Sequence, residues 1–341
     1  MVIYHFTTNL SGGGAETQLR ILAENLPING LKQRVVFKFA ANGFPFDKYK
    51  TIDFIKIADF DFSKLEKSRV ILHIWIPDVF TYISPFSFYR HRDFVLIGIR
   101  NRYSFNSLKR VYQFFCFTLF KHFVSNVPLE LHRRHYKFLF QNKYEFIPNA
   151  LKYPINNTSK TFSGARFLFV GRLVPQKGVI DLIKTFSLLK EFDFEVTIVG
   201  EGQLFHEARN LIKNAGLNER IFLEGYKNDV LEYYNLSDFF ILPSYNEGMP
   251  NVAFEAASQN CILILSDLAE NRYWFSEEEV FFFKPGNIYS LRDVILSSLS
   301  ISNEQRSTMI YNSKKILKKL SLESYLVSYM SLYDNIRIEN D

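Results

Sequence analysis

Short apolar runs alternate with amphipathic segments along nearly the whole chain, and this alternation limits the possible folds more than any other feature. Fully apolar runs of this length are typical of parallel strands that are buried on both faces. Strands that alternate with helices predict a parallel α/β sheet. The runs expected to be strands lie at 2–7, 35–40, 69–76, 94–100, 122–126 and 144–148, and then at 166–171, 194–200, 220–225, 238–244 and 261–267.

The pattern occurs twice, which predicts two α/β domains. A chain of 341 residues is longer than one hydrophobic core usually supports. The stretch KYPINNTSKTFS at 152–163 is polar and has no period, so we expect an interdomain linker there. The predicted domains are residues 1–155 and 160–320, each Rossmann-like, with a cleft between their sheet edges. We expect the C-terminal helix in 321–341 to cross back onto the first domain.

The composition is that of an ordinary soluble globular protein, with 47% hydrophobic and 22% charged residues. Cys116 and Cys261 are too few and too far apart for a disulfide framework or a zinc site, which fits a reducing cytoplasm. No stretch approaches the about 18 apolar residues of a membrane span. The N-terminus MVIYHFTTNL has no basic region and is expected to be a strand rather than a signal peptide. We therefore expect a cytoplasmic protein.

Positive charge is concentrated in one aromatic-rich segment. Residues 85–145 hold eleven Lys and Arg but three Asp and Glu, whereas the whole chain has a net charge of +6. Basic residues interleaved with Phe and Tyr suit an anionic membrane surface, a lipid phosphate or a nucleic acid. The alternative is a helical layer whose aromatic side chains face the core and whose basic side chains are solvated. The two interpretations are compatible if each face of the layer has one role.

The stretch FFILPSYNEGMPNVAFEAA at 239–257 predicts a strand, a short loop and a helix with Asn251 as its N-cap. A loop that leads from a strand to a helix N-terminus lies at the carboxyl edge of the sheet, where ligands bind and where anions are favoured. Glu247 in the loop and Glu255 in the helix are placed to accept hydrogen bonds from hydroxyl groups. The alternative is a surface loop with solvated glutamates.

A second strand end carries basic residues in the turn VGRLVPQKG at 170–178. Arg172 and Lys177 are expected to point into the same crevice as Glu247. A guanidinium and an ammonium there would neutralise a diphosphate and stabilise it as a leaving group. At the first strand, the turn SGGGAE at 11–16 lets the backbone approach a phosphate or a sugar, but it is not the dinucleotide-binding G-x-G-x-x-G pattern.

Together, FLFVGRLVPQKGVIDLI, VTIVGEGQLF and LPSYNEGMPNVAFEA resemble family 4 of the retaining glycosyltransferases, which have the GT-B fold. The resemblance spans most of residues 1–300 and is strongest from 165 to 268. SGGGAE is similar to the family's glycine loop, and FIPNA at 146–150 to its Ile-Pro-Asn-Gly, with Ala150 in place of glycine. The order and spacing of these motifs make the resemblance specific.

The resemblance implies roles for the matching residues. Arg172 and Lys177 match positions that bind the donor diphosphate. Glu247 matches a glutamate that contacts the hydroxyl groups of the donor sugar, and Glu255 matches one that holds the ribose. Glu247, Arg172 and Lys177 are expected to carry the transfer step. The full expected donor set is Gly13, Gly14, Arg172, Lys177, Glu247, Gly248, Met249, Pro250, Asn251 and Glu255.

The sequence departs from the family pattern at two places. Family members often carry a His after a strand of the first domain, but here Arg100 stands about there and His73 lies inside an earlier strand. Both are acceptor-side candidates, although a packed strand histidine is the simpler interpretation of His73. The family's Gly-Gly after the strand at 261–267 is replaced by LAEN at 268–271, which leaves the donor sugar open.

The resemblance implies a bacterial enzyme of lipopolysaccharide, O-antigen or capsule biosynthesis. It would transfer a hexose-type sugar, with retention, from a UDP- or GDP-linked donor to a glycan. The basic aromatic segment 85–145, and not the donor motifs, is the reason to expect a lipid-linked glycan at the cytoplasmic face of the inner membrane. Asp59 and Asp61 have the spacing of the metal-binding carboxylate pair of GT-A enzymes, but they lie in the first half, away from the donor motifs. No metal is therefore expected. Nucleic acid is not an expected partner. Two alternatives stay open, a GT-B sugar-nucleotide epimerase and a non-catalytic basic and aromatic binding module.

Overall fold

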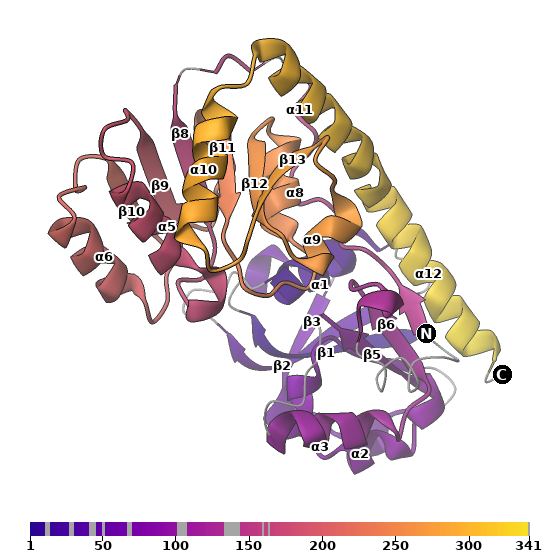
Figure 1. The fold of residues 1–341 in the computed structure, drawn as a ribbon. Coiled ribbons are helices and arrows are strands. Elements are labelled where there is room, and N and C mark those ends of the chain that lie inside the picture. Colours follow the sequence, from indigo (N-terminus) through magenta and orange to yellow (C-terminus); the bar gives the residue numbers. More distant parts are fainter. Residues whose placement is uncertain are drawn as a thin grey trace. The chain divides into compact units, whose positions relative to one another are not determined.

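The chain divides into two compact units in the computed structural model. Unit 1 is Met1–Ala150 with Ser321–Asp341, and unit 2 is Leu151–Leu320. The structure describes residues 1–10, 14–26, 31–40, 46–49, 52–66, 70–100, 108–132, 144–158, 160–162 and 164–339. Each unit is built on a parallel sheet, so the predicted α/β class is confirmed (Figure 1).

Unit 1 holds a seven-stranded sheet in the order β3-β2-β1-β4-β5-β6-β7, in which all recorded strand pairs are parallel. The strand order reverses between β1 and β4, which makes the carboxyl ends of these strands a topological switch point. The strands are β1 (Val2–Leu10), β2 (Lys32–Ala40), β3 (Ile52–Lys56), β4 (Val70–Ile74), β5 (Val95–Ile99), β6 (His122–Ser125) and β7 (Tyr144–Phe146), and the helices are α1 (Gly14–Asn25), α2 (Pro85–Tyr89), α3 (Leu108–Phe117) and α12 (Leu322–Ile338).

Helices cover both faces of the unit 1 sheet, because alternate strand residues are apolar on each side. On one face, α1 and α12 pack against side chains such as Ile3, Ile71 and Leu96. On the other face, α2 and α3 bury Phe88 and Phe117 against neighbouring strand residues. The buried tyrosines of α12 stand at helical spacing and pack into this core. The C-terminal helix therefore belongs to the first unit.

Unit 2 holds a six-stranded sheet in the order β10-β9-β8-β11-β12-β13, again with parallel pairs. This order places the carboxyl ends of β8 and β11 next to each other. The strands are β8 (Arg166–Val170), β9 (Glu195–Val199), β10 (Ile221–Gly225), β11 (Phe239–Leu242), β12 (Ile262–Ser266) and β13 (Val280–Phe283), and the helices are α5 (Val179–Ser187), α6 (Phe205–Asn214), α7 (Leu231–Leu236), α8 (Asn251–Ser258), α9 (Ala269–Trp274), α10 (Ile288–Leu299) and α11 (Asn303–Leu317).

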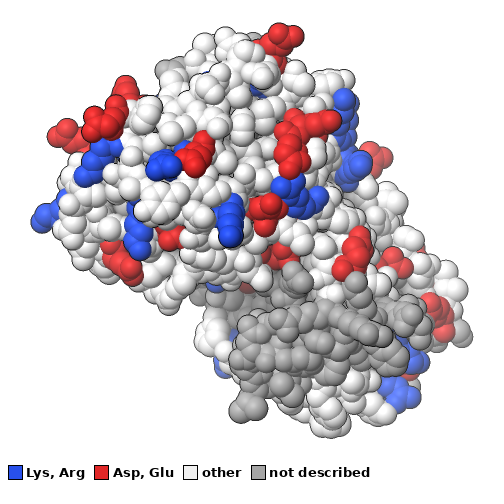
Figure 2. All heavy atoms as spheres, in the orientation of Figure 1, with Lys and Arg blue, Asp and Glu red and all other residues white. Residues whose placement is uncertain are grey.

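The two faces of the unit 2 sheet are covered by different helices. Helices α5, α6 and α10 pack against one set of alternate strand residues, α7 and α8 pack against the other set, and α11 contributes side chains to both clusters. Helix α10 packs beside α5 and the edge strand β13. The visible face of unit 2 carries Lys and Arg mixed with Asp and Glu (Figure 2), so that face holds no large single-sign field.

The structure differs from the prediction at the expected linker and at two edge strands. The described residues of this stretch, 152–158 and 160–162, are part of unit 2 and do not form a free linker. Tyr153 is buried and donates to Asp229 Oδ1 at 2.7 Å, and Lys160 Nζ donates to the carbonyl of Tyr234 at 3.0 Å. These long-range contacts are invisible to a local pattern. The predicted strands did not include β3 and β13, which are both edge strands.

None of the helices in the described part of the chain is both long and apolar enough to cross a bilayer.

Candidate functional site

The site in unit 2 is built on the loop between β11 and α8. The apolar strand ends at Leu242, Pro243 breaks it, and residues 247–250 of the loop are buried although they are not in a strand or a helix. The predicted N-cap is wrong. Asn251 is the first helical residue, and the carbonyl of Pro250 accepts from Ala253 N at 2.9 Å to close the first turn. Pro250 has no side-chain acceptor, so its side chain does not cap the first N–H groups of α8.

Lys177 and Glu247 meet at the carboxyl ends of neighbouring strands. Lys177 ends the short 3-10 helix Pro175–Lys177 after β8, and its Nζ lies 2.7 Å from Glu247 Oε1. The side chains are 16% and 7% exposed, so this ion pair is largely shielded from water. The structure thus brings together the cation and the carboxylate that the sequence predicted for one crevice. An ion pair this sheltered is stronger than a surface pair, which contributes little.

Arg172 is the other predicted diphosphate ligand and lies on the turn directly after β8. Its side chain is exposed, and it forms no ion pair with any carboxylate in the described part of the chain. The guanidinium is therefore free to bind an anion. Arg172 and Lys177 share this turn but differ in state, because Lys177 already neutralises Glu247.

Close backbone packing holds these turns together. Gly178 has φ +67°, and a Cβ there would lie 2.0 Å from the carbonyl oxygen of Pro243. Tyr245 N donates to the carbonyl of Gln176 at 2.8 Å, and Gln176 Nε2 donates to the carbonyl of Asn246 at 2.8 Å. Only glycine fits the left-handed backbone at this contact. The glycine therefore fixes the position of Lys177 relative to the β11–α8 loop.

Glu255 lies one turn into α8, where its carboxyl group accepts a hydrogen bond from the Tyr234 hydroxyl at 3.1 Å. Burial raises the pKa of Glu255 to about 7, while Lys152 and the Tyr234 hydrogen bond act in the opposite direction. Close to pH 7 this carboxyl group is therefore divided between its protonated and ionised forms. A group with a pKa perturbed by burial is a candidate for ligand binding.

Sequence reasoning missed several polar residues around the loop. Ser244 Oγ is buried and has no hydrogen-bond partner within the described residues. Its place directly after the strand end was the available signal. The Tyr245 hydroxyl donates to Asp181 in the first turn of α5, a contact between distant segments that no local pattern reveals. The LAEN sequence at 268–271 is not an open loop, because residues 269–274 form α9 and Glu270 and Asn271 are buried.

In unit 1 the predicted candidates fall in different places. Gly13 lies outside the described residues, and Gly14 is the exposed first residue of α1. His73 is fully buried in β4 and its Nδ1 lies 2.8 Å from the Tyr333 hydroxyl, so it is a packed core histidine. Arg100 directly follows β5 and is also buried, with Nη2 donating to the Tyr329 hydroxyl at 2.8 Å.

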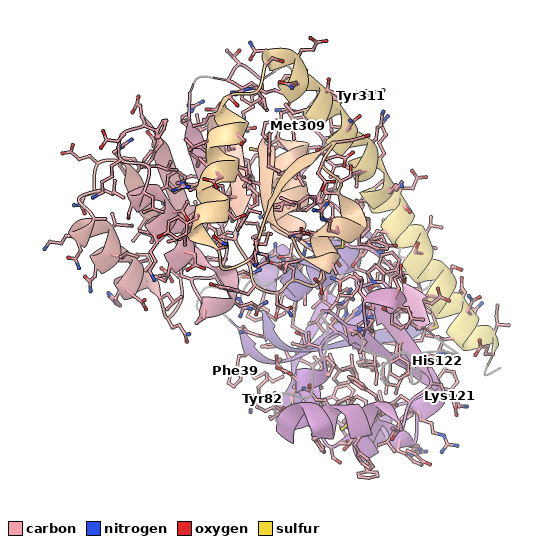
Figure 3. All side chains as sticks on the ribbon, in the orientation of Figure 1. Phe39, Tyr82, Lys121, His122, Met309 and Tyr311 are labelled. Carbon is pink, nitrogen blue, oxygen red and sulfur yellow. The ribbon has the colours of Figure 1, made fainter. Side chains whose placement is uncertain are left out.

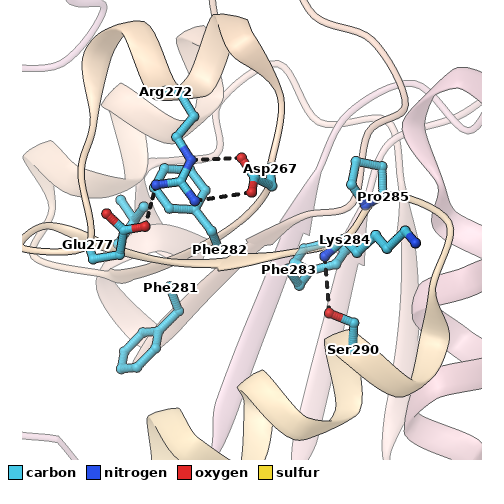
Figure 4. Close-up of a pocket in the computed structure, with 10 residues that line it drawn as sticks. Asp267, Arg272, Glu277, Phe281, Phe282, Phe283, Lys284, Pro285 and Ser290 are labelled. Atoms are coloured by element: carbon cyan, nitrogen blue, oxygen red, sulfur yellow. Dashed lines mark hydrogen bonds and ion pairs between the residues drawn. The ribbon is translucent and has the colours of Figure 1, made fainter.

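A separate cavity of about 580 Å³ lies beside the edge strand β13 (Figure 4). Arg272 spans it by binding Asp267 through two hydrogen bonds of 2.7 and 3.0 Å, and it also pairs with Glu277. Two carboxylates already pair with this guanidinium. The cavity contains none of the residues of the β11–α8 loop. Within the described residues, no group of three His, Cys, Asp or Glu side chains could hold a metal ion.

Known proteins resemble this chain in the sequence of unit 2 and in the fold. Residues 158–316 match the family model for glycosyl transferases group 1. The capsular polysaccharide biosynthesis glycosyltransferase CapH of Staphylococcus aureus is 34% identical over 140 residues, 39% of this chain and 39% of that protein. The N-acetylgalactosamine-N,N'-diacetylbacillosaminyl-diphospho-undecaprenol 4-alpha-N-acetylgalactosaminyltransferase of Campylobacter jejuni is 36% identical over 100 residues, 29% of this chain and 27% of that protein. These alignments span less than half of either relative.

The fold comparison extends over nearly the whole chain. The solved structure of Anabaena Alr3699/HepE in complex with UDP and glucose has a TM-score of 0.80 and 14% identity, and covers 98% of this chain and 100% of that one. At this identity the likeness concerns the fold alone, which is GT-B as predicted. The sequence match and the fold agree: residues 158–316 match the glycosyl transferases group 1 model, and the chain has the GT-B fold.

Proposed function

We propose that this chain is a retaining glycosyltransferase that moves a sugar from a nucleotide-sugar donor to a lipid-linked glycan in capsule or O-antigen assembly. The observation that carries the proposal is the shielded Lys177–Glu247 pair at the adjoining ends of β8 and β11, inside a glycosyl transferases group 1 domain. The names of two relatives support it, since one is a capsular polysaccharide glycosyltransferase and the other acts on a diphospho-undecaprenol-linked sugar.

The proposed chemistry relies on charge rather than on a covalent intermediate. The bond between the donor sugar and the diphosphate breaks, and the acceptor oxygen forms the new bond on the same face of the sugar. The acceptor proton passes to a donor phosphate oxygen. Arg172 and Lys177 stabilise the leaving diphosphate, and Glu247 accepts a hydrogen bond from a sugar hydroxyl. No metal is required in this scheme, and no carboxylate pair is assigned to a double displacement.

The donor is proposed to be a UDP-sugar, with a GDP-sugar as the second candidate. A structural neighbour was solved with UDP and glucose, which supports UDP as the first choice. Glu255 in its ionised form would accept hydrogen bonds from the ribose hydroxyls. The buried loop residues Gly248, Met249 and Pro250, with Asn251 at the start of α8, would line the donor site.

The acceptor is proposed to be reached at an anionic membrane surface through the outer face of α2 and α3. These helices bury Phe88 and Phe117, yet Phe86 is 64% and Phe115 is 53% exposed. Large aromatic side chains on both faces exceed what the core needs and suit the interface of a bilayer. Tyr89 and Tyr112 are also exposed on these helices, Arg90 and Arg92 are exposed after α2, and Phe39 and Tyr82 are exposed elsewhere in unit 1.

Cations stand beside these aromatic rings, which supports an anionic partner. Lys38 Nζ lies 5.8 Å from the ring centre of Phe39 and 5.7 Å from that of Tyr82, and these two rings are in contact (Figure 3). Arg92 lies over the ring of Tyr89. Anionic lipid headgroups would bind the cations while the aromatic rings enter the interface. The protein would thus be a cytoplasmic enzyme held peripherally on the inner membrane.

The two alternatives fit the site less well. An epimerase needs acid and base groups on both sides of the sugar carbon, whereas the described loop itself supplies one carboxylate, Glu247, and the following helix supplies Glu255. A nucleic-acid binding module leaves the Lys177–Glu247 pair and Arg172 without a role, and its binding would fall steeply with salt.

A thermal-shift screen followed by a transfer assay tests the proposed function. UDP, GDP and ADP are added without metal to the full chain and to the Arg172→Gln variant. A nucleotide at about 100 times its Kd adds about 2.7 kcal/mol of stability, enough for a clear shift. We expect one nucleotide to stabilise the wild type and to act far less on the variant, and its sugar conjugate to support transfer to a prenyl-diphosphate glycan. Absence of any nucleotide response in the wild type would reject the proposal.

A further inference from the structure

Arg100 is a buried cation at the carboxyl edge of the unit 1 sheet. It follows β5 directly, at the edge where ligands of parallel sheets bind, and only 7% of it is exposed. Its Cζ lies 4.3 Å from the ring centre of Trp75, which follows the neighbouring strand β4. Its Nη2 donates to the Tyr329 hydroxyl of α12.

Within the described residues, the positive charge of Arg100 has no partner of opposite sign. Arg100 Nε and Nη1 are buried without a hydrogen bond, and no carboxylate within the described residues pairs with the guanidinium. Burial lowers the pKa of His73 well below its usual value and raises the pKa of Tyr333 well above its usual value, so both are neutral near pH 7. A guanidinium does not lose its proton in proteins. The positive charge therefore remains, and it is uncompensated.

A purely structural role does not account for this arrangement. Buried charges in proteins are normally paired, and unpaired buried donors are rare enough to need an explanation. Stacking on Trp75 and one tyrosine hydrogen bond leave two nitrogen atoms of Arg100 unsatisfied. Arginine is the side chain best suited to bind phosphate through several hydrogen bonds. An anion of the phosphate class would satisfy both the charge and the free donors.

We propose that Arg100 binds a phosphate oxyanion of the acceptor through Nε and Nη1. The identity of the acceptor rests on the proposed function, whereas the anion site itself does not. Both nitrogen atoms are covered in this structure, so the guanidinium must move off Trp75 and release Tyr329 when the anion binds. The Arg100–Tyr329 hydrogen bond thus competes with the acceptor.

Binding of inorganic pyrophosphate, measured by calorimetry, tests the site. The full-length Arg172→Gln, Lys177→Gln double variant is the background, because it removes the proposed diphosphate ligands of unit 2. Adding Arg100→Gln should weaken pyrophosphate binding at least tenfold. Adding Tyr329→Phe, which keeps the ring but removes the competing hydroxyl, should tighten it about fivefold. Lys64→Gln, which removes an exposed charge from unit 1, should leave the Kd unchanged.

The tyrosine variant separates ligand binding from structural support. If Arg100 has only a structural role, Tyr329→Phe will lower the Tm and leave the Kd of pyrophosphate unchanged, which would overturn the proposal. If Arg100→Gln does not fold, the Kd of pyrophosphate measured for Arg100→Lys and for Tyr329→Phe tests the proposal instead. Vesicles with a prenyl diphosphate, compared with vesicles of equal charge without it, distinguish a lipid headgroup from a free phosphate. If the lipid headgroup is the ligand, the Arg100 side chain should strengthen binding to the vesicles that contain prenyl diphosphate. If the ligand is a free phosphate, it should not.

This inference and the proposed function can fail separately. Pyrophosphate binding that depends on Arg100, in a protein that transfers no sugar, would sink the transferase proposal and keep the anion site. Sugar transfer with a Kd for pyrophosphate that does not respond to Arg100→Gln or Arg100→Lys would sink the anion site alone.

Discussion

Lys177 Nζ donates a hydrogen bond of 2.7 Å to Glu247 Oε1 across 70 positions of sequence. The pair joins the turn after β8 to the loop after β11, and both side chains are mostly shielded from water. In the proposed donor complex, the phosphate binds the Lys177 ammonium and a sugar hydroxyl binds the Glu247 carboxylate. The ion pair holds these two groups in place before the donor arrives. Preorganised charges of this kind cost no rearrangement at the reaction step.

Replacing Glu247 with Gln should lower sugar transfer by about 100-fold or more, since it removes one preorganised charge from the site. The same change leaves the Lys177 ammonium without its partner, so the free energy of unfolding should fall by about 1 to 3 kcal/mol. Turnover and urea unfolding measure the two effects. Glu219→Gln, an exposed glutamate of the same unit, is the matched control. Wild-type turnover in the Glu247 variant would remove this residue from the site.

Glu255 should make the stability of the protein depend on pH. Its pKa is raised in the folded state from 4.5 to about 7, so its stabilising contribution is present below pH 4.5 and is lost as the pH rises through 7. The full loss amounts to about 3 kcal/mol, at 1.36 kcal/mol per pKa unit, and about 2 to 3 kcal/mol of it falls between pH 5 and pH 8. Urea unfolding at pH 5 and pH 8 should show this difference in the wild type and a smaller one in Glu255→Gln. Equal differences in both proteins would mean that the carboxyl group titrates normally.

The same carboxyl group should link UDP binding to pH. A ribose hydroxyl donates to the ionised form, so binding requires a proton to leave when Glu255 is protonated. With a pKa of about 7, UDP affinity should be about tenfold lower at pH 6 than at pH 8. Calorimetry in buffers of different ionisation enthalpy measures the released proton directly. The Glu255→Gln variant should bind UDP more weakly at pH 8 and with little pH dependence.

Gly178→Ala should destabilise the chain by about 2 to 4 kcal/mol and reduce transfer. The new methyl group would meet the carbonyl oxygen of Pro243 at 2.0 Å, in a backbone with φ +67°. Gly216 is the matched control, because it has φ +68° and nothing within 4 Å of an added Cβ. Gly216→Ala should therefore cost only about 1 kcal/mol. Similar losses in the two variants would show that backbone conformation, and not the contact with Pro243, sets the cost.

Removing aromatic side chains from α2 and α3 should weaken membrane association. The double change Phe86→Ser, Phe115→Ser should lower partitioning onto vesicles with anionic lipid by about tenfold or more. Tyr289→Ser, Tyr311→Ser is the control, since these rings are equally exposed but lie on unit 2. Salt should weaken wild-type binding only in part, because the aromatic contribution does not depend on charge. Equal partitioning of both double variants would reject this face as the docking surface.

The local sequence determined the elements and the ends of the strands. Apolar runs such as Phe239–Leu242 and Arg166–Val170 predict buried parallel strands, and the residues that follow them fall at the carboxyl edge for that reason alone. The positions of Arg172, Lys177 and Glu247 at this edge therefore follow from the sequence alone. The C-terminal helix, which was expected to cross back onto the first domain, belongs to unit 1.

Only the tertiary structure decided which of these residues touch and in what charge state. The pairing of Lys177 with Glu247 depends on the order of strands in the sheet, and the raised pKa of Glu255 depends on burial beside Tyr234, which is 21 positions away. The isolation of Arg100 likewise depends on α12, which is 229 positions away. Periodicity sets which side of an element is apolar, whereas charge pairing and burial are set by which elements pack together. The sequence therefore predicts which residues are candidates, whereas the tertiary structure sets their contacts, burial and charge states.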